Sequence, residues 1–145
     1  MKTLLIFGLP GTGKTTLAKT LCEKIDADWF NADEIRKLAD DWDFSEEGRL
    51  RQCHRMRGLC GGSIIAGRHA VADFVCPRNE YREIFNPDIT IWMDTLEKGR
   101  YDDTNQIFER PQSLKVNDGD FIITADSWWN EDFTEEWAKL IALKV

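Results

Sequence analysis

The feature that most constrains this chain is a glycine-rich segment near its start, Gly8 to Thr15. Its letters, GLPGTGKT, fit the spacing G-x-x-x-x-G-K-[ST], in which glycines let consecutive backbone N–H groups turn inward around phosphate oxygens. An apolar run from Lys2 to Phe7 precedes the segment, and apolar residues at helical spacing follow it as far as Ile25. This strand–loop–helix context predicts a cradle for a nucleoside triphosphate, a P-loop.

The chemistry of the loop predicts its ligands. Lys14 can reach the β- and γ-phosphates, and the hydroxyl of Thr15 can ligate Mg²⁺. We therefore expect ATP and Mg²⁺ as cofactors, with the choice between ATP and GTP left open. The expected ATP-binding residues are Gly8, Pro10, Gly11, Thr12, Gly13, Lys14, Thr15 and Thr16.

Apolar runs and helical periodicity alternate along the rest of the chain. Strands are expected at 2–7, 28–30, 70–75, 89–93 and 121–124, and helices at 15–25, 31–39, 45–65 and 79–85, with a closing helix that contains Phe133 and Trp137. The polar stretch 94–111 is interpreted as a mobile segment. The alternation predicts an α/β protein with the three-layer P-loop NTPase fold, about five parallel strands flanked by helices, in a single domain spanning 1–145.

Charge is unevenly distributed. The net charge of −7 argues against a protein that coats nucleic acid without sequence preference. The stretch from Arg49 to Arg82 nevertheless carries +5, which leaves −12 for the rest of the chain. A local basic patch fits a small anionic ligand or a short contact with a nucleic-acid backbone.

Neither a membrane segment nor a metal-binding cysteine pattern is expected. No run of 18 apolar residues occurs, and the first apolar run is too short for a signal peptide, so we expect a cytoplasmic protein with no membrane partner. Cys22, Cys53, Cys60 and Cys76 are scattered, which favours free thiols over a zinc site.

The chain resembles the adenylylsulfate kinases in several segments that keep the same order. After the P-loop that family carries D-G-D-x-x-R, G-F-S, F-I-S-P, V-D-T and Y-E-x-P. The corresponding segments here are 31–36 (NADEIR), 43–45 (DFS), 74–77 (FVCP), 93–95 (MDT) and 108–111 (FERP).

The resemblance implies transfer of the γ-phosphoryl group of ATP to the 3′-hydroxyl of adenylylsulfate. It implies that Asp33 faces the acceptor hydroxyl and that Arg36 holds the acceptor's anionic group. It also places Phe44 against the acceptor base and Arg55 near the substrate. Arg51, Arg78 and Asp73 are also expected to contact the acceptor, although Arg51 and Arg78 occupy positions where this sequence departs from the family pattern.

The residues themselves support a role for Asp33, because a carboxylate just past the second strand lies at the sheet edge where open α/β folds bind ligands. The alternatives are that Asp33 caps the following helix and that Arg36, one turn later, forms an ion pair with it. Asp73 lies inside an apolar strand, where a carboxylate is costly unless it is paired or serves a metal ion. It is expected either to act on metal or acceptor, or to be paired internally.

The segment between 95 and 111 is shorter than the substrate lid of the adenylylsulfate kinases. A short lid encloses the acceptor less completely, which makes a polynucleotide or a 5-hydroxymethylpyrimidine DNA kinase the alternative function. Arg100 and Arg110 flank the lid, and either could swing over the transferring phosphoryl group; Arg110 is taken as the catalytic candidate. The alternative for each is a solvated surface charge. Trp128 and Trp129 are expected to anchor the last helix in the core, the alternative being that the pair stacks on a base.

We therefore predict a P-loop kinase whose acceptor bears a hydroxyl and is anionic, either a small nucleotide or a nucleic-acid base. Lys14 and Asp33 are the other expected catalytic residues. A homologue that binds ATP without transfer is a further alternative, and a homodimer is left open.

Overall fold

The computed structural model describes residues 1–130 and 132–145, and its centre is a parallel β-sheet. The strands are β1 (Thr3–Phe7), β2 (Asp28–Asn31), β3 (Ala70–Phe74), β4 (Ile89–Asp94) and β5 (Phe121–Thr124), in the order β2-β3-β1-β4-β5. All four strand pairs are parallel. Since β1 lies between β3 and β4, the loop that follows it leaves the sheet near its middle.

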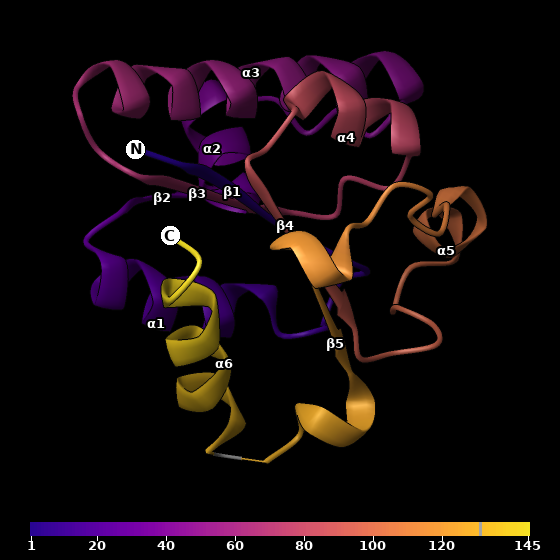
Figure 1. Cartoon of the computed structure of the whole chain (residues 1–145). Coiled ribbons are helices and arrows are strands. Elements are labelled where there is room, and N and C mark those ends of the chain that lie inside the picture. The colour runs from indigo at the N-terminus through magenta and orange to yellow at the C-terminus, as the bar shows by residue number, and fades with distance from the viewer. Residues whose placement is uncertain (131) are drawn as a thin grey trace.

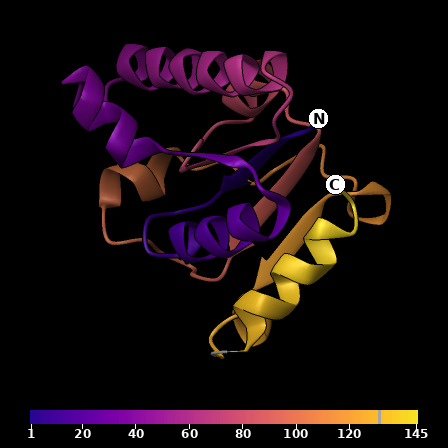
Figure 2. The same ribbon diagram turned by 90° about the vertical axis from the view of Figure 1, so that its left-hand side faces the viewer.

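Helices cover both faces of the sheet (Figures 1 and 2). On one face lie α1 (Lys14–Ile25) and α6 (Phe133–Ala142), and on the other lie α2 (Ala32–Ala39), α3 (Glu46–Ile65) and α4 (Asn79–Phe85). A short helix, α5 (Asp102–Ile107), and the 3₁₀ turns η1 (Val116–Asp118) and η2 (Ala125–Ser127) complete the fold. The predicted three-layer α/β fold is confirmed.

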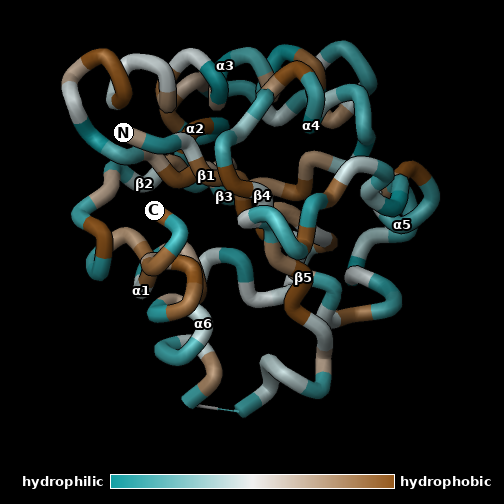
Figure 3. Tube along the Cα trace, in the orientation of Figure 1, coloured by the Kyte–Doolittle hydropathy of each residue, from teal (hydrophilic) through white to brown (hydrophobic). Residues whose placement is uncertain are grey.

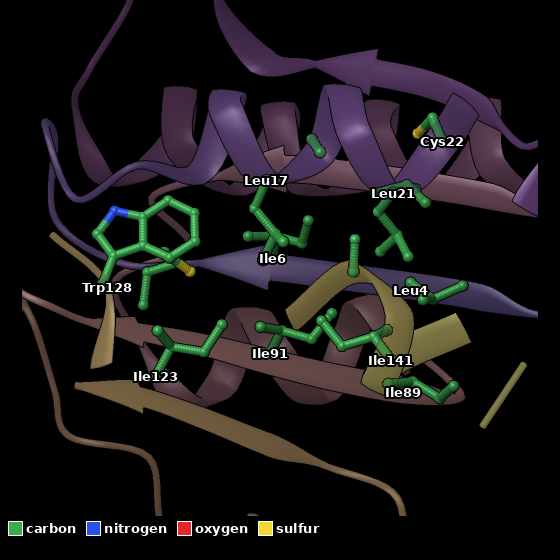
Figure 4. Close-up of a cluster of buried hydrophobic side chains, with 14 residues drawn as sticks. Leu4, Ile6, Leu17, Leu21, Cys22, Ile89, Ile91, Ile123, Trp128 and Ile141 are labelled. Carbon is green, nitrogen blue, oxygen red and sulfur yellow. The ribbon is translucent and has the colours of Figure 1, made fainter. Parts of the chain in front are cut away.

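The hydrophobic core has two halves, one on each face of the sheet. Strand β1 contributes side chains to both halves of the core. Leu4 and Ile6 point to the side of α1 and α6, whereas Leu5 and Phe7 point to the side of α3 and α4. All four side chains are fully buried. A parallel sheet covered on both faces requires such a continuously apolar strand. Figure 4 shows the first half between α1, α6 and the sheet, and Figure 3 shows hydrophobic residues gathered along the strands.

Capping side chains explain where two helices begin. Asn31 ends β2 and its Oδ1 accepts a hydrogen bond from the backbone N–H of Glu34, and Ser45 caps α3 in the same way through Gly48. Asn31 rather than Asp33 is therefore the cap of α2. The sequence interpretation missed α5, which lies within the stretch taken as a mobile polar segment.

The outer face of α3 is open at two of its glycines. Nothing lies within 4 Å of where a Cβ on Gly58 or Gly62 would be, because this face points away from the sheet. Among the residues described, no helix is both long and apolar enough to cross a membrane.

Candidate active site

The P-loop leaves β1 at Gly8 and enters α1 at Lys14, as the sequence predicts. Gly11 and Gly13 have φ angles of +83° and +98°, in the region that side chains other than glycine rarely adopt. Thr95, just beyond β4, braces the loop from the sheet by donating from Oγ1 to the carbonyl of Thr12 at 2.8 Å. The loop is thus held open by its glycines and supported from the neighbouring strand.

Lys14 is buried at the floor of the loop. Its Nζ donates to the carbonyl oxygen of Leu9 at 2.9 Å, inside the ring of the loop. Burial lowers the pKa of Lys14 to about 8, an effect opposed by the negative charges of Asp73 and Asp33. An ammonium group held in a buried site beside two carboxylates is suited to bind phosphate oxygens.

Asp73 lies at the end of β3, beside Ile6 of β1 and Asn31 of β2 in the sheet register. It is only 2% exposed, and its carboxylate accepts hydrogen bonds from Trp29 Nε1 at 2.7 Å and from Asn31 Nδ2 at 3.1 Å. Burial raises the pKa of Asp73, whereas these donors and Lys14 oppose the rise. Asp73 is therefore internally paired, yet it also faces the P-loop cavity.

The side chains beside the loop suit Mg²⁺. Asn31 Nδ2 lies within hydrogen-bond distance of both Asp73 and the Thr15 hydroxyl (3.4 Å), so these two oxygen groups flank the same point. Hard cations such as Mg²⁺ prefer oxygen ligands and commonly take one or two from the protein, with the rest from phosphates and water. No cluster of three or more His, Cys, Asp or Glu suited to a metal ion occurs in the part of the chain that the structure describes.

A cavity of about 660 Å³ opens beside the P-loop on the β2 and β3 side. Lys14, Thr15 and Asp73 line it together with Asp33, which is exposed in the first turn of α2. The structure therefore brings together the predicted phosphate-binding residues and the predicted acceptor-side carboxylate.

Three arginines predicted to bind the acceptor are occupied elsewhere. Arg36 is buried, and its guanidinium donates to the backbone carbonyls of Asp41 (2.9 Å) and Asp43 (3.1 Å) rather than pairing with Asp33. Arg51 and Arg55, one turn apart on α3, both bind the carboxylate of Asp41 at 2.8 Å. Hydrogen bonds from these two arginines hold the pKa of Asp41 well below its usual range. The five residues form a network that shapes the loop between α2 and α3.

Phe44 and Arg49 form the wall of the cavity that this loop provides. Phe44 lies under two guanidinium groups, 4.3 Å from that of Arg36 and 5.4 Å from that of Arg49. Arg49 donates from Nε to the carbonyl of Phe44 and faces Asp103 of α5 at 3.8 Å. Sequence reasoning missed Arg49, because nothing in its spacing separates it from the other arginines of the basic stretch.

The short lid lies directly on the P-loop. Asn105 closes the lid turn by exchanging two hydrogen bonds with the backbone of Gly99, at 2.8 and 3.0 Å. A Cβ on Gly99 would lie 3.2 Å from Pro10, and a Cβ on Gly11 would lie 3.7 Å from the guanidinium of Arg100. Arg100 therefore lies over the loop and lines the same cavity as Lys14.

Arg110, the lid arginine predicted to be catalytic, lies elsewhere. Its guanidinium stacks over Trp92 at 4.9 Å and lines a second cavity of about 360 Å³ at the ends of β4 and β5. Arg78 directly precedes α4, makes no side-chain capping hydrogen bond there, and lines neither cavity. Thr16 is exposed on α1 and also lies outside both linings.

Two segments that carry the family resemblance meet in space. The backbone N–H of Glu109 donates to the carbonyl of Pro77 at 2.7 Å. Buried Arg82 joins the two segments by donating to the carbonyls of Cys76 (2.9 Å) and Glu109 (2.8 Å). The return of the lid is therefore attached to the loop that follows β3.

The two adjacent tryptophans after β5 have different environments. Trp128 is buried in the core with Ala138 and Ile141 of α6, as predicted. Trp129 is more than half exposed, so the same prediction is wrong for it, although its Nε1 donates to the carbonyl of Thr95 at 3.3 Å.

Comparisons with known proteins agree with this architecture. The family model described as ATPase family associated with various cellular activities (AAA) matches residues 4–61, less than half of the chain. No curated protein sequence matches.

Among solved structures, this chain is similar to a sugar kinase from Janibacter sp. (TM-score 0.72, 13% identity, covering 97% of this chain and 93% of that one). It is similar to a gluconokinase from Sinorhizobium meliloti (0.70, 10%, 99% and 92%). It is also similar to the adenylylsulfate kinase of Mycobacterium tuberculosis solved with AMPPNP and APS (0.69, 20%, 99% and 98%). The chain therefore has the P-loop NTPase kinase fold, and kinases named for different acceptors share it.

Proposed function

We propose that this protein is an ATP-dependent phosphotransferase that moves the γ-phosphoryl group to a hydroxyl group of its acceptor. The observation that carries the proposal is one cavity lined by Lys14 and Thr15 of the P-loop and by the carboxylates Asp33 and Asp73. A triphosphate held in the loop would extend toward these carboxylates, because the cavity opens from the loop on the β2 and β3 side.

In this proposal the donor is held by backbone N–H groups and side chains of Gly8 to Thr16, with Lys14 on the β- and γ-phosphates. Thr15 and Asp73 would hold Mg²⁺, Asp73 through water. The ion would neutralise charge on the phosphate oxygens when bound. Arg100 is proposed to stabilise the charge of the transferring group, because it lies over the loop, whereas Arg110 belongs to the other cavity.

The chemical step is an in-line displacement. The acceptor oxygen forms a bond to the γ-phosphorus as the bond between that phosphorus and the β–γ bridging oxygen breaks, which releases ADP. The hydroxyl proton passes to the carboxylate of Asp33 and from there to water. Asp33 suits this role because it is exposed in the cavity and does not cap α2.

The finer identity of the acceptor is also a proposal. The sequence resemblance implies the 3′-hydroxyl of adenylylsulfate, with Phe44 against its base, and the short lid makes a hydroxymethylpyrimidine in DNA the alternative. Two carboxylates facing the P-loop favour a catalyst over a homologue that only binds ATP. We place the reaction in the cytoplasm.

The test is transfer of labelled phosphate from ATP to adenylylsulfate, nucleosides, sugars, and DNA with and without hydroxymethylpyrimidines. Lys14→Ala is expected to abolish transfer. Asp33→Asn is expected to retain ATP binding and to lower kcat by about a hundredfold or more. Glu34→Gln changes the neighbouring carboxylate, which does not line the cavity, and should have near-normal kcat. A near-normal kcat for Asp33→Asn would show that the acceptor side is wrongly assigned.

A further inference from the structure

We infer that the acceptor is an uncharged ring compound bearing a hydroxyl, a free nucleoside or a sugar, rather than an anionic metabolite. The inference rests on the proposed function, since it concerns the acceptor half of the same cavity. It departs from the anionic acceptor that the sequence favours. Three observations carry it: the aromatic wall of the cavity, the balance of its charges, and the positions of its arginines.

The aromatic wall consists of Trp42, Phe44 and Tyr101. These side chains are 51%, 48% and 54% exposed, and all three line the cavity that holds Lys14 and Asp33. They come from two separate segments, the loop before α3 and the lid. Large aromatic side chains are usually buried, so three half-exposed ones on one cavity indicate a ligand that presents a flat, weakly polar surface. Nucleoside bases and the faces of sugar rings both do so.

The charges of the cavity cancel before any ligand enters. Three basic side chains, Lys14, Arg49 and Arg100, line it together with three carboxylates, Asp33, Asp73 and Asp103. The phosphates of the donor then add negative charge beside the acceptor position, and one Mg²⁺ would offset only part of it. An anionic acceptor would therefore enter a region with no positive excess, at an electrostatic cost that a neutral acceptor does not have.

The arginines that would offset this cost are occupied. Arg51 and Arg55 bind Asp41. The Arg36 guanidinium donates to backbone carbonyls and lines only a side pocket of about 60 Å³ next to the cavity. Of the two arginines that line the cavity, Arg49 faces Asp103, and Arg100 lies over the P-loop where the donor phosphates would be. The acids of the loop between α2 and α3 thus already pair with the arginines of α3.

The test compares matched acceptors that differ in charge, using labelled ATP and the whole chain. The comparisons are adenosine with AMP and with adenylylsulfate, thymidine with thymidine monophosphate, and glucose with glucuronate, which keeps the sugar ring. The neutral member of the preferred pair is expected to have kcat/KM about tenfold or more above its anionic partners. The nucleoside and sugar arms distinguish the two sources of a neutral ring. Preference for any anionic member, or for DNA over free nucleosides, would overturn the inference.

A variant separates this inference from the proposed function. Asp103→Asn releases Arg49, and it is expected to raise kcat/KM for the anionic member of the preferred pair about threefold or more, with unchanged affinity for ATP. No gain for the anionic member would count against the inference, even if the protein is a kinase.

If ATP binds but no acceptor is labelled, the proposed phosphotransfer activity is contradicted. The inference about the charge of the acceptor is then tested by measuring acceptor binding. Each acceptor is titrated in the presence of AMPPNP, and the change in Trp42 fluorescence is taken as the difference between the native chain and Trp42→Phe. Tighter binding of the neutral members supports the inference. Equal or tighter binding of the anionic members, or no binding of any neutral ring, overturns it.

Discussion

The indole ring of Trp128 occupies the space that a side chain on Gly13 would need. A Cβ built on Gly13 would lie 2.6 Å from the Cε2 atom of Trp128, far inside contact distance. Figure 4 shows the ring at the end of the core cluster, with its nitrogen pointing out of the cluster. The last glycine of the P-loop is thus required for two reasons. Its φ of +98° disfavours any other residue, and a tryptophan more than 110 residues later in the chain leaves no room for a side chain.

Gly13→Ala is expected to weaken ATP binding severely and to lower the free energy of unfolding by about 2 kcal/mol, because both the backbone and Trp128 must move. Gly58→Ala is the matched control. It lies in α3 with nothing within 4 Å, so the exchange should stabilise the protein by about 0.5–1 kcal/mol. Urea unfolding and calorimetric titration with ATP measure both effects. Native-like ATP affinity in Gly13→Ala would contradict this account of the loop.

ATP binding is expected to weaken above pH 8. Burial lowers the pKa of Lys14 from 10.5 to about 8 in the free protein, so the ammonium form that binds phosphate is lost above that pH. Phosphate favours the protonated form, and binding above pH 8 should therefore take up a proton, with affinity falling by up to about tenfold per pH unit. Calorimetry at pH 9 in buffers of different ionisation enthalpy measures this uptake. Its absence would mean that Lys14 keeps its proton in the free protein.

Asp73→Asn is expected to raise the Mg²⁺ concentration required for half-maximal activity about tenfold, because the carboxylate proposed to act on the ion's water shell loses its charge. The asparagine retains an oxygen for Trp29, so the fold should persist, as circular dichroism can verify. Asp26→Asn, at an exposed carboxylate on the far side of α1, is the control. An unchanged Mg²⁺ requirement would leave Asp73 with a purely structural role.

Arg82→Met is expected to lower the free energy of unfolding by about 3 kcal/mol, since it leaves the buried carbonyl of Cys76 and the partly buried carbonyl of Glu109 without their donors. The guanidinium also stacks on Phe7, 4.2 Å from the ring centre. Arg57→Met, on the exposed face of α3, should change stability by less than about 0.5 kcal/mol. Equal stabilities of the two variants would show that Arg82 does not hold the lid return in place.

Much of the fold was predictable because its signals are local. The strand bounds differ from those expected by one residue at most, since apolar runs bounded by Gly, Pro and polar residues mark buried parallel strands. Ser45 and Asn31 marked helix starts through their own side chains. Helix α5 was missed because its six residues, DDTNQI, carry no apolar face and are helical only in their place on the P-loop.

The candidate site was predictable in its donor half and less so in its acceptor half. The P-loop is a contiguous pattern, and the position of Asp33 followed from strand order. The arginines could not be sorted in this way. Arg49, Arg51 and Arg55 share one basic stretch, Arg36 precedes it on α2, and only their partners distinguish them. The roles predicted for Asp33, Arg36 and Arg110 stay predictions until variants are measured.

The sequence by itself determined the parallel sheet, the phosphate loop and the carboxylate beside it, because each depends on residues close together in the chain. Only the tertiary structure decided which side chains face the cavity. In the tertiary structure Arg100 lies over the P-loop, Arg110 lines the second cavity, and Asp41 pairs with two arginines. The physical reason is that a charged side chain takes whichever opposite charge or carbonyl the fold brings near, and that choice depends on distances in space that no spacing along the chain records.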